Sequence, residues 1–196
     1  MNSTLYPVHC YVLAGGRSRR LGQDKARATI AEETSLIEAV IEPLEGVFSS
    51  FTLVARERQW GEDLGFRTIT DRHSDMGPLG GISRALEDAG QGYIFVISCD
   101  RIGLQPRWVQ LLRAQLVDEP RAVCFHVDER HEPLFAFYHC SVAGVLADFL
   151  ERGGRAVWRF LDEIDVTTVD APPRWNQSFS VNTPEQLQRA RRWYRQ

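Results

Sequence analysis

The chain has 196 residues, a length typical of one domain, so we expect a single domain over residues 1–196. Hydrophobic residues make up 43% and charged residues 25%, which excludes a mainly disordered chain. The net charge of −3 provides no strong positive field and argues against a nucleic-acid-binding protein.

The cysteines and the apolar runs indicate a cytoplasmic protein with reduced thiols. The four cysteines lie far apart and form no CxxC pair or zinc-type spacing. The apolar stretch at 11–14 is too short for a signal peptide, and no run approaches the ~20 apolar residues of a membrane span. We therefore expect no membrane partner, and a monomer or a weak oligomer.

The first half of the chain alternates predicted strands and helices. Strands are predicted over 8–14, 51–55, 66–70 and 93–98. Helices are predicted over 34–44 and 108–117, and residues 80–86 are predicted to open another. The run at 93–98 is apolar throughout, as expected for a strand covered on both faces. This alternation predicts an α/β fold with a parallel sheet between two layers of helices.

The second half predicts an antiparallel element in this sheet. Strands are predicted over 121–127, 134–138 and 166–169, and helices over 141–150, 156–161 and 184–194. The short polar link at 128–131 indicates a hairpin. Thr183 and Pro184 have the residue types expected at the N-cap and first position of the final helix. We therefore expect a mostly parallel sheet with a mixed hairpin region.

The first candidate site is the loop LAGGRSRRLGQDK at residues 13–25. Gly15 and Gly16 allow the backbone to approach a ligand, and their N–H groups can form a nest for an anion. Arg20 and Lys25 add positive charge. Lys25 is the one lysine beside 22 arginines, and its compact ammonium differs from the planar guanidinium. These features predict a polyphosphate cradle, although an ordinary turn with a solvated basic face has the same composition.

Two further loops follow predicted strands, where ligands bind in open α/β sheets. Asp100 stands two residues after the apolar run at 93–98. A carboxylate beside a phosphate cradle suggests Mg²⁺. Asp71 follows another strand, and Gly77 and Pro78 begin the sequence GPLGG, whose N–H groups at a helix start can meet a ligand. The alternatives are an Asp that caps a turn and simple loop punctuation. If the strands are parallel, all three loops lie at one sheet edge.

Four motifs resemble those of the molybdenum cofactor guanylyltransferases. The run LAGGRSRRLGQDKA resembles LAGG-x-S-x-R-M-G-x-D-K-A, which opens that family, and GPLGG resembles its GPL-small-G loop. Ser98-Cys99-Asp100 is similar to its CD motif, and SVNTPEQL at 180–187 to its closing NxNTPEEL. The matches occur in order and span residues 13 to 187, nearly the whole chain.

This resemblance implies a Rossmann-like three-layer nucleotidyltransferase fold. Members of the family use GTP and Mg²⁺ to attach GMP to the phosphate of molybdopterin, and they release pyrophosphate. The catalytic groups would be Lys25, Arg20 and Asp100, with Asp100 as the metal ligand. Together with the loop arguments above, the resemblance places contacts to the nucleotide or the acceptor at Leu13, Ala14, Gly15, Gly16, Lys25, Asp71, Gly77, Pro78 and Asn182. A molybdoenzyme or its chaperone is a further expected partner.

The sequence departs from the family at four places. Val54 stands where relatives carry an Asn that reads guanine, which puts base selectivity in question. The family's CDxP has become Cys99-Asp100-Arg101-Ile102, its HP has become Glu132-Pro133, and Ser180 replaces the first Asn of NxN.

Two alternative functions stay open. One is a molybdopterin cytidylyltransferase or a sugar- or alcohol-phosphate nucleotidyltransferase; the other is a non-catalytic nucleotide- or molybdopterin-binding adaptor.

Overall fold

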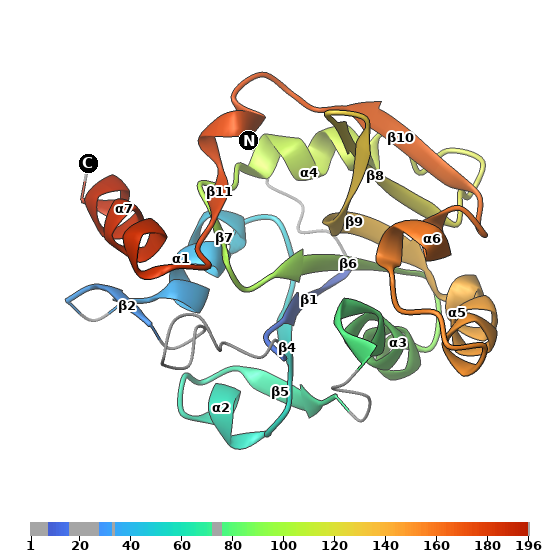
Figure 1. Cartoon of the computed structure of the whole chain (residues 1–196), viewed down its shortest axis with the longest axis horizontal. Coiled ribbons are helices and arrows are strands. Elements are labelled where there is room, and N and C mark those ends of the chain that lie inside the picture. Colours follow the sequence, from blue (N-terminus) through green and yellow to red (C-terminus); the bar gives the residue numbers. More distant parts are fainter. Residues whose placement is uncertain (1–7, 16–27, 33, 72–75, 196) are drawn as a thin grey trace.

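A seven-stranded sheet runs through the computed structural model, which describes residues 8–15, 28–32, 34–71 and 76–195, apart from the side chain of Trp60. Its strands are β1 (His9–Leu13), β4 (Phe51–Ala55), β5 (Arg67–Thr70), β6 (Tyr93–Ser98), β8 (Ala122–Val127), β9 (Arg130–His139) and β10 (Val166–Asp170). They lie in the order β10-β8-β9-β6-β1-β4-β5 (Figure 1). Strand β9 is antiparallel to β6 and β8, and the other pairs are parallel. The expected mixed, mostly parallel sheet is confirmed.

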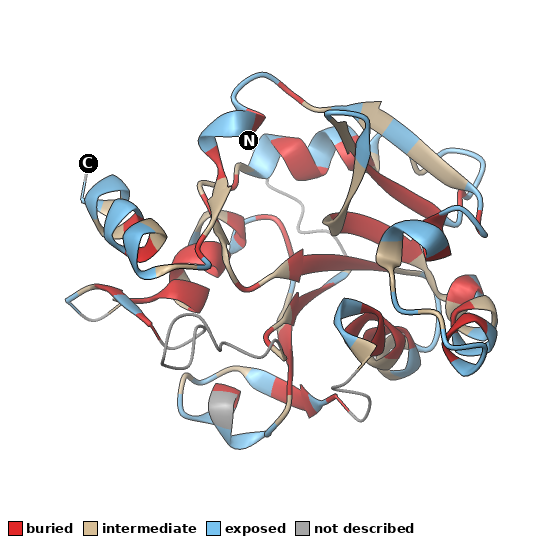
Figure 2. Ribbon diagram, viewed as in Figure 1, coloured by how far each residue is buried: buried red, intermediate tan, exposed pale blue. Residues whose placement is uncertain are grey.

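Helices cover both faces of this sheet, which gives the expected three layers (Figures 1 and 2). The helices are α1 (Leu36–Ile41), α2 (Gln59–Glu62), α3 (Pro78–Ala89), α4 (Pro106–Arg113), α5 (Ala143–Glu151), α6 (Val157–Leu161) and α7 (Pro184–Tyr194), with short 3₁₀ turns η1 (Glu42–Leu44), η3 (Cys140–Val142) and η4 (Trp175–Gln177). Successive strand side chains point to opposite faces. Cys10 and Val12 therefore pack in a core with α1, α4 and α7, and Tyr11 in a second core with α3, α5 and α6.

The helix ends follow local capping signals. Ser35 caps α1 and forms a capping box with Glu38, and Thr183 does the same for α7 with Gln186. The final helix has the predicted bounds, whereas the helix predicted over 34–44 ends at Ile41 and continues as η1. The helix predicted over 108–117 begins earlier, because Pro106 occupies its first turn, and it ends at Arg113.

The predicted hairpin is present, with a shorter link than expected. Asp128 and Glu129 form a two-residue turn with φ values of 45° and 61°, so β9 starts at Arg130. Two positive φ values in sequence are the geometry of a type I′ turn, which matches the twist of antiparallel strands. Strand β9 is therefore long enough to extend past the end of β6.

Two short ribbons were not predicted. Strand β2 (Thr29–Ala31) pairs with β3 (Thr34–Ser35), and β7 (Arg101–Ile102) pairs antiparallel with β11 (Phe179–Ser180). The second ribbon joins the segment after β6 to the segment before α7. Among the described residues, no helix has the length and apolarity needed to cross a membrane.

Candidate active site

The order of the strands creates a switch point between β1 and β6. From β1 the chain moves outward to β4 and β5, and it then returns to place β6 on the other side of β1. Loops that leave the carboxyl ends of two such strands diverge, and ligands of open α/β sheets bind in the crevice between them. The segments after Leu13 and Ser98 flank this point.

Backbone hydrogen bonds connect the carboxyl ends of the four parallel strands. The amide of Cys99 donates to the carbonyl of Leu13 (3.2 Å), and the amide of Ala14 donates to the carbonyl of Val54 (2.8 Å). The amide of Asp71 donates to the carbonyl of Ala55 (2.8 Å). The expectation that the three loops begin at one sheet edge is therefore confirmed.

Gly15 lies next to the carboxylate of Asp71. A Cβ atom built on Gly15 would be 3.5 Å from Asp71 Oδ2, and Asp71 is buried. A side chain larger than a methyl group at this position would occupy the space beside that carboxylate. The structure thus brings together Ala14, Gly15 and Asp71, three residues that the sequence assigns to nucleotide contact.

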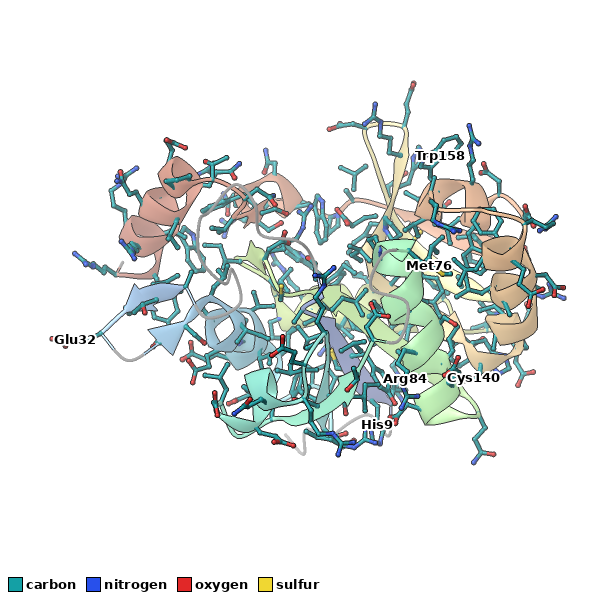
Figure 3. The ribbon with its side chains drawn as sticks, turned by 60° about the horizontal axis from the view of Figure 1, so that its bottom comes forward. His9, Glu32, Met76, Arg84, Cys140 and Trp158 are labelled. Carbon is teal, nitrogen blue, oxygen red and sulfur yellow. The ribbon has the colours of Figure 1, made fainter. Side chains whose placement is uncertain are left out.

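Helix α3 begins at the same edge. Gly77 has φ 64° and ψ −150°, a conformation that strongly favours glycine, and Pro78 is the first helical residue. A Cβ on Gly81 would be 3.0 Å from Leu13 Cδ2, so the first turns of α3 lie against the end of β1. In Figure 3, Met76 marks this end of α3, and His9 marks the opposite end of β1. Gly77 and Pro78 are exposed, which leaves the helix start open to a ligand.

The segment from Ser180 to Asn182 lies beside Asp100. Ser180 pairs with Arg101 in the β7–β11 ribbon, and the amide of Val181 donates to the carbonyl of Asp100 (2.8 Å). Asn182 follows directly and is exposed. Its backbone N–H donates to Gln186 Oε1 (2.7 Å) in the first turn of α7. Two residues that are distant in sequence, Asp100 and Asn182, thus share one edge of the molecule.

An ion pair near Asp100 was not foreseen. Arg101 Nη2 donates to Glu132 Oε2 at 2.7 Å, and Nη1 donates to Ser178 Oγ at 3.1 Å. The guanidinium also lies over the ring of Trp175, 4.8 Å from its centroid. Burial raises the pKa of Glu132, the charge of Arg101 opposes this rise, and the charge of Asp100 adds to it. The one available signal was Glu132, which replaces the His of the family's HP; Arg101 stands at the variable position of CDxP.

The donor set at this edge fits a divalent metal ion that is bound mainly by its substrate. No group of three or more His, Cys, Asp or Glu side chains that could hold a metal ion is found within the part of the chain that the structure describes. The half-buried Asp100 does stand at the switch point. Mg²⁺ is commonly held by one or two carboxylates, with water and phosphate oxygens as its other ligands. The residues therefore fit a substrate-linked Mg²⁺ and do not provide an all-protein cage.

The proposed base-reading position requires a correction. Val54 lies inside β4, its side chain is 1% exposed, and it packs in the core with α3. It therefore cannot present a side chain to a base, and its contribution to the edge is the carbonyl that Ala14 contacts. The residue that follows β4 is Arg56. The absence of an Asn at Val54 thus carries no information about base selectivity.

Three expected site residues, Gly16, Arg20 and Lys25, lie outside the described residues. The proposed phosphate site depends on a short distance between the Lys25 ammonium and the Asp100 carboxylate. Because Lys25 is outside the described residues, that distance stays a prediction. Their assignment stays a prediction from the sequence.

Comparison with known proteins agrees with this architecture. Residues 10–166, most of the chain, match the MobA-like NTP transferase domain. The chain belongs to the MobA-like NTP transferase family. It is therefore a nucleotidyltransferase.

Relatives cover nearly the full length of this nucleotidyltransferase. The molybdenum cofactor guanylyltransferase of Syntrophotalea carbinolica is 28% identical over 188 residues, which are 92% of this chain and 89% of that protein. A probable molybdenum cofactor guanylyltransferase of Opitutus terrae is 31% identical, with 92% and 93% covered. The crystal structure of molybdopterin-guanine dinucleotide biosynthesis protein A from Archaeoglobus fulgidus has a TM-score of 0.79 and 26% identity, with 96% and 99% covered.

Proposed function

We propose that this MobA-like enzyme transfers GMP from GTP to the phosphate of molybdopterin and releases pyrophosphate. The observation that carries the proposal is that the segments with Gly15, Asp71 and Asp100 begin at one edge of the sheet, where Gly15 lies beside the Asp71 carboxylate. The near-complete coverage of relatives with a guanylyltransferase name supports the choice of nucleotide and acceptor.

The reaction joins two anions, so its main demands are alignment and charge stabilisation. An oxygen of the molybdopterin phosphate attacks the α-phosphorus of GTP. The new O–P bond forms as the bond to the β-phosphate oxygen breaks, and the electron pair leaves with pyrophosphate. No covalent enzyme intermediate is needed, because phosphoryl chemistry of this kind depends on positioning and electrostatics.

We assign the nucleotide to the loops after β1 and β5 and to the start of α3. The backbone of Leu13, Ala14, Gly15 and Gly16, the carboxylate of Asp71, and the exposed start of α3 at Gly77 and Pro78 would contact it. Lys25 and Arg20 would offset the charge that grows on the leaving pyrophosphate. These assignments follow the family motif, and the described positions among them share one edge.

We assign the metal and the acceptor to the other side of the switch point. Asp100 would hold Mg²⁺, which would supply positive charge to stabilise the charge that develops on the phosphates. Asn182, exposed on the segment that contacts Asp100, would line the acceptor side. The chain would thus act in the cytoplasm as one domain, with its first half binding nucleotide and its second half binding the acceptor.

Thermal unfolding with nucleotides tests the choice of base. The unfolding temperature would be measured with GTP, CTP, UTP and ATP, each with and without Mg²⁺, because a ligand that binds the native state stabilises it. We expect stabilisation by GTP with Mg²⁺. Stabilisation by CTP alone would favour a cytidylyltransferase and contradict the guanylyl assignment.

Product formation separates an enzyme from an adaptor. With GTP, Mg²⁺ and molybdopterin we expect release of pyrophosphate and formation of a guanine dinucleotide product. Binding of GTP without release of pyrophosphate would instead indicate a protein that carries nucleotide or molybdopterin.

A further inference from the structure

The side chain next to the proposed metal ligand is a cation held by a partner. Arg101 follows Asp100 directly, and its guanidinium donates to Glu132 and Ser178 and stacks on Trp175. The Arg101 and Glu132 side chains are only 19% and 18% exposed. This contact is therefore better shielded than an ordinary surface ion pair.

Strand β9 brings Glu132 to the segment that follows β6. The β6–β9 pairing ends at Ile97 and Phe135, and past that point the Glu132 carboxylate accepts from Arg101, the residue after Asp100, at 2.7 Å. Burial raises the pKa of Glu132, the charge of Arg101 opposes this rise, and the charge of Asp100 adds to it. Three charges, two negative and one positive, thus lie together at the end of β6.

A guanidinium beside a metal carboxylate opposes cation binding. It repels a divalent ion, and it can form its own ion pair with the carboxylate that the ion requires. In this partly buried place, such charge effects are screened less than on an open surface. The carboxylate of Glu132 accepts a hydrogen bond from the Arg101 guanidinium, and its negative charge offsets the positive charge of Arg101.

We propose that Glu132 is a positioning residue that holds Arg101 and offsets its charge, so that Asp100 remains available to the divalent cation bound with the nucleotide. The inference rests on the role of Asp100 given under the proposed function. A purely structural pair, one that only fastens β9 to the β7–β11 ribbon, would have a different signature. Loss of either Arg101 or Glu132 would then weaken cation binding to a similar extent.

Cation binding distinguishes the two roles by the sign of the effect. Mn²⁺, a spin-active substitute for Mg²⁺, would be titrated by electron paramagnetic resonance in the presence of α,β-methylene GTP, which blocks transfer. We expect Glu132→Gln to weaken Mn²⁺ binding about tenfold, and Arg101→Gln to leave it unchanged or tighten it. The double variant should return to within about twofold of the wild-type protein.

Three further variants complete the experiment. Glu132→Asp keeps the charge and should stay within about threefold of wild type. Glu163→Gln breaks an ion pair of similar length but greater exposure, Arg152–Glu163 at 2.6 Å in the α5–α6 region, and should have no effect. Asp100→Asn should abolish the Mn²⁺ signal that depends on nucleotide, and thermal unfolding would check that each variant is folded.

The outcomes separate failure of this inference from failure of the proposed function. If Asp100→Asn binds Mn²⁺ like wild type, the metal role of Asp100 is wrong. If Asp100→Asn loses binding but Glu132→Gln does not weaken it, only the positioning role is wrong. Equal weakening by Arg101→Gln and Glu132→Gln would also overturn it. Should Glu132→Gln fail to fold, weaker binding by Arg101→Gln alone would be sufficient to overturn it.

Discussion

At the scale of single residues, Asp100 is the described side chain on which the proposed chemistry depends most. It follows the buried strand β6, and its carbonyl is fixed by the amide of Val181 at 2.8 Å. A carboxylate held at a strand end can bind a metal ion without first becoming ordered. The side chain's contribution is therefore expected in the transition state, where charge on the phosphates is greatest.

Asp100→Ala should lower turnover about 100-fold or more while the protein stays folded. Well-placed charge in a polar site contributes about 3–4 kcal/mol, and each 1.36 kcal/mol changes the rate tenfold. Pyrophosphate release under saturating GTP would measure the effect, and Asp148→Ala, at an exposed position of α5, is the control. Activity of Asp100→Ala near that of wild type would remove Asp100 from the mechanism.

At the scale of elements, a polar cluster connects two strands and a helix away from the active edge. Asp88 of α3 accepts from Arg67 at both oxygens (2.7 and 2.9 Å) and from the Tyr11 hydroxyl (2.9 Å). The hydrogen bond from Arg67, followed by that from Tyr11, lowers the pKa of Asp88 against the effect of its partial burial. The cluster thus ties β5 and β1 to the helix whose other end forms the candidate site.

Asp88→Asn should lower stability at neutral pH and matter little in acid. A carboxyl group with a lowered folded-state pKa stabilises the protein above its unfolded pKa, about 3.9, and that contribution is lost as pH falls through the folded value. Urea unfolding should show a difference from wild type of about 1 kcal/mol at pH 7 that shrinks toward pH 3. A difference that is the same at both pH values would exclude this linkage.

The hairpin turn between β8 and β9 carries a backbone conformation that its sequence does not favour. Glu129 has φ 61°, a region that glycine occupies without steric cost. Glu129→Gly should therefore stabilise the protein by about 0.5–1 kcal/mol in urea unfolding. Glu45→Gly is the matched control, because Glu45 is also exposed and has φ −56°. The control should destabilise, and the same sign for both variants would contradict the argument.

The elements that the sequence predicted well are those with local signals. The final helix begins with Thr183 and Pro184, which act within one turn, and the apolar run at 93–98 identified β6. The β7–β11 ribbon gave no such signal, since each strand has two residues and the partners are far apart in sequence. The same holds for the contact between Arg101 and Glu132, which lie 31 residues apart in sequence and meet only in the folded chain.

The candidate site also has features that the sequence predicted and one that it did not. Glycines and carboxylates after predicted strands pointed to the correct edge, because parallel strands must share it. The misplacement of Val54 has a different cause. The strand was predicted over 51–55, the bounds that β4 has, so Val54 already lay inside it; a base-reading residue of the following loop was instead compared with this buried strand position.

At the scale of the whole molecule, two cores share one set of strands. Trp108 and Trp175 lie in the core with α1 and α4, and Cys124 lies in the core with α3 and α5. Within β8, Cys124 and Phe125 are neighbours that face opposite cores. Neither core can be lost without freeing the strands that the other needs, so the described chain should unfold as one unit.

Two probes, one for each core, test this cooperativity. The fluorescence of the buried Trp108 and Trp175, measured with the exposed Trp158 and Trp193 replaced by Phe, follows the first core. Alkylation of Cys124, read by mass spectrometry, follows the second. Burial raises the pKa of Cys124 to about 12, so its thiol should react at pH 8 only after unfolding. We expect both probes to give one urea midpoint, and GTP with Mg²⁺ to raise the two midpoints together. Labelling of Cys124 at lower urea than the fluorescence change would instead show that the α3–α5 side opens separately, and the chain would then not behave as a single domain.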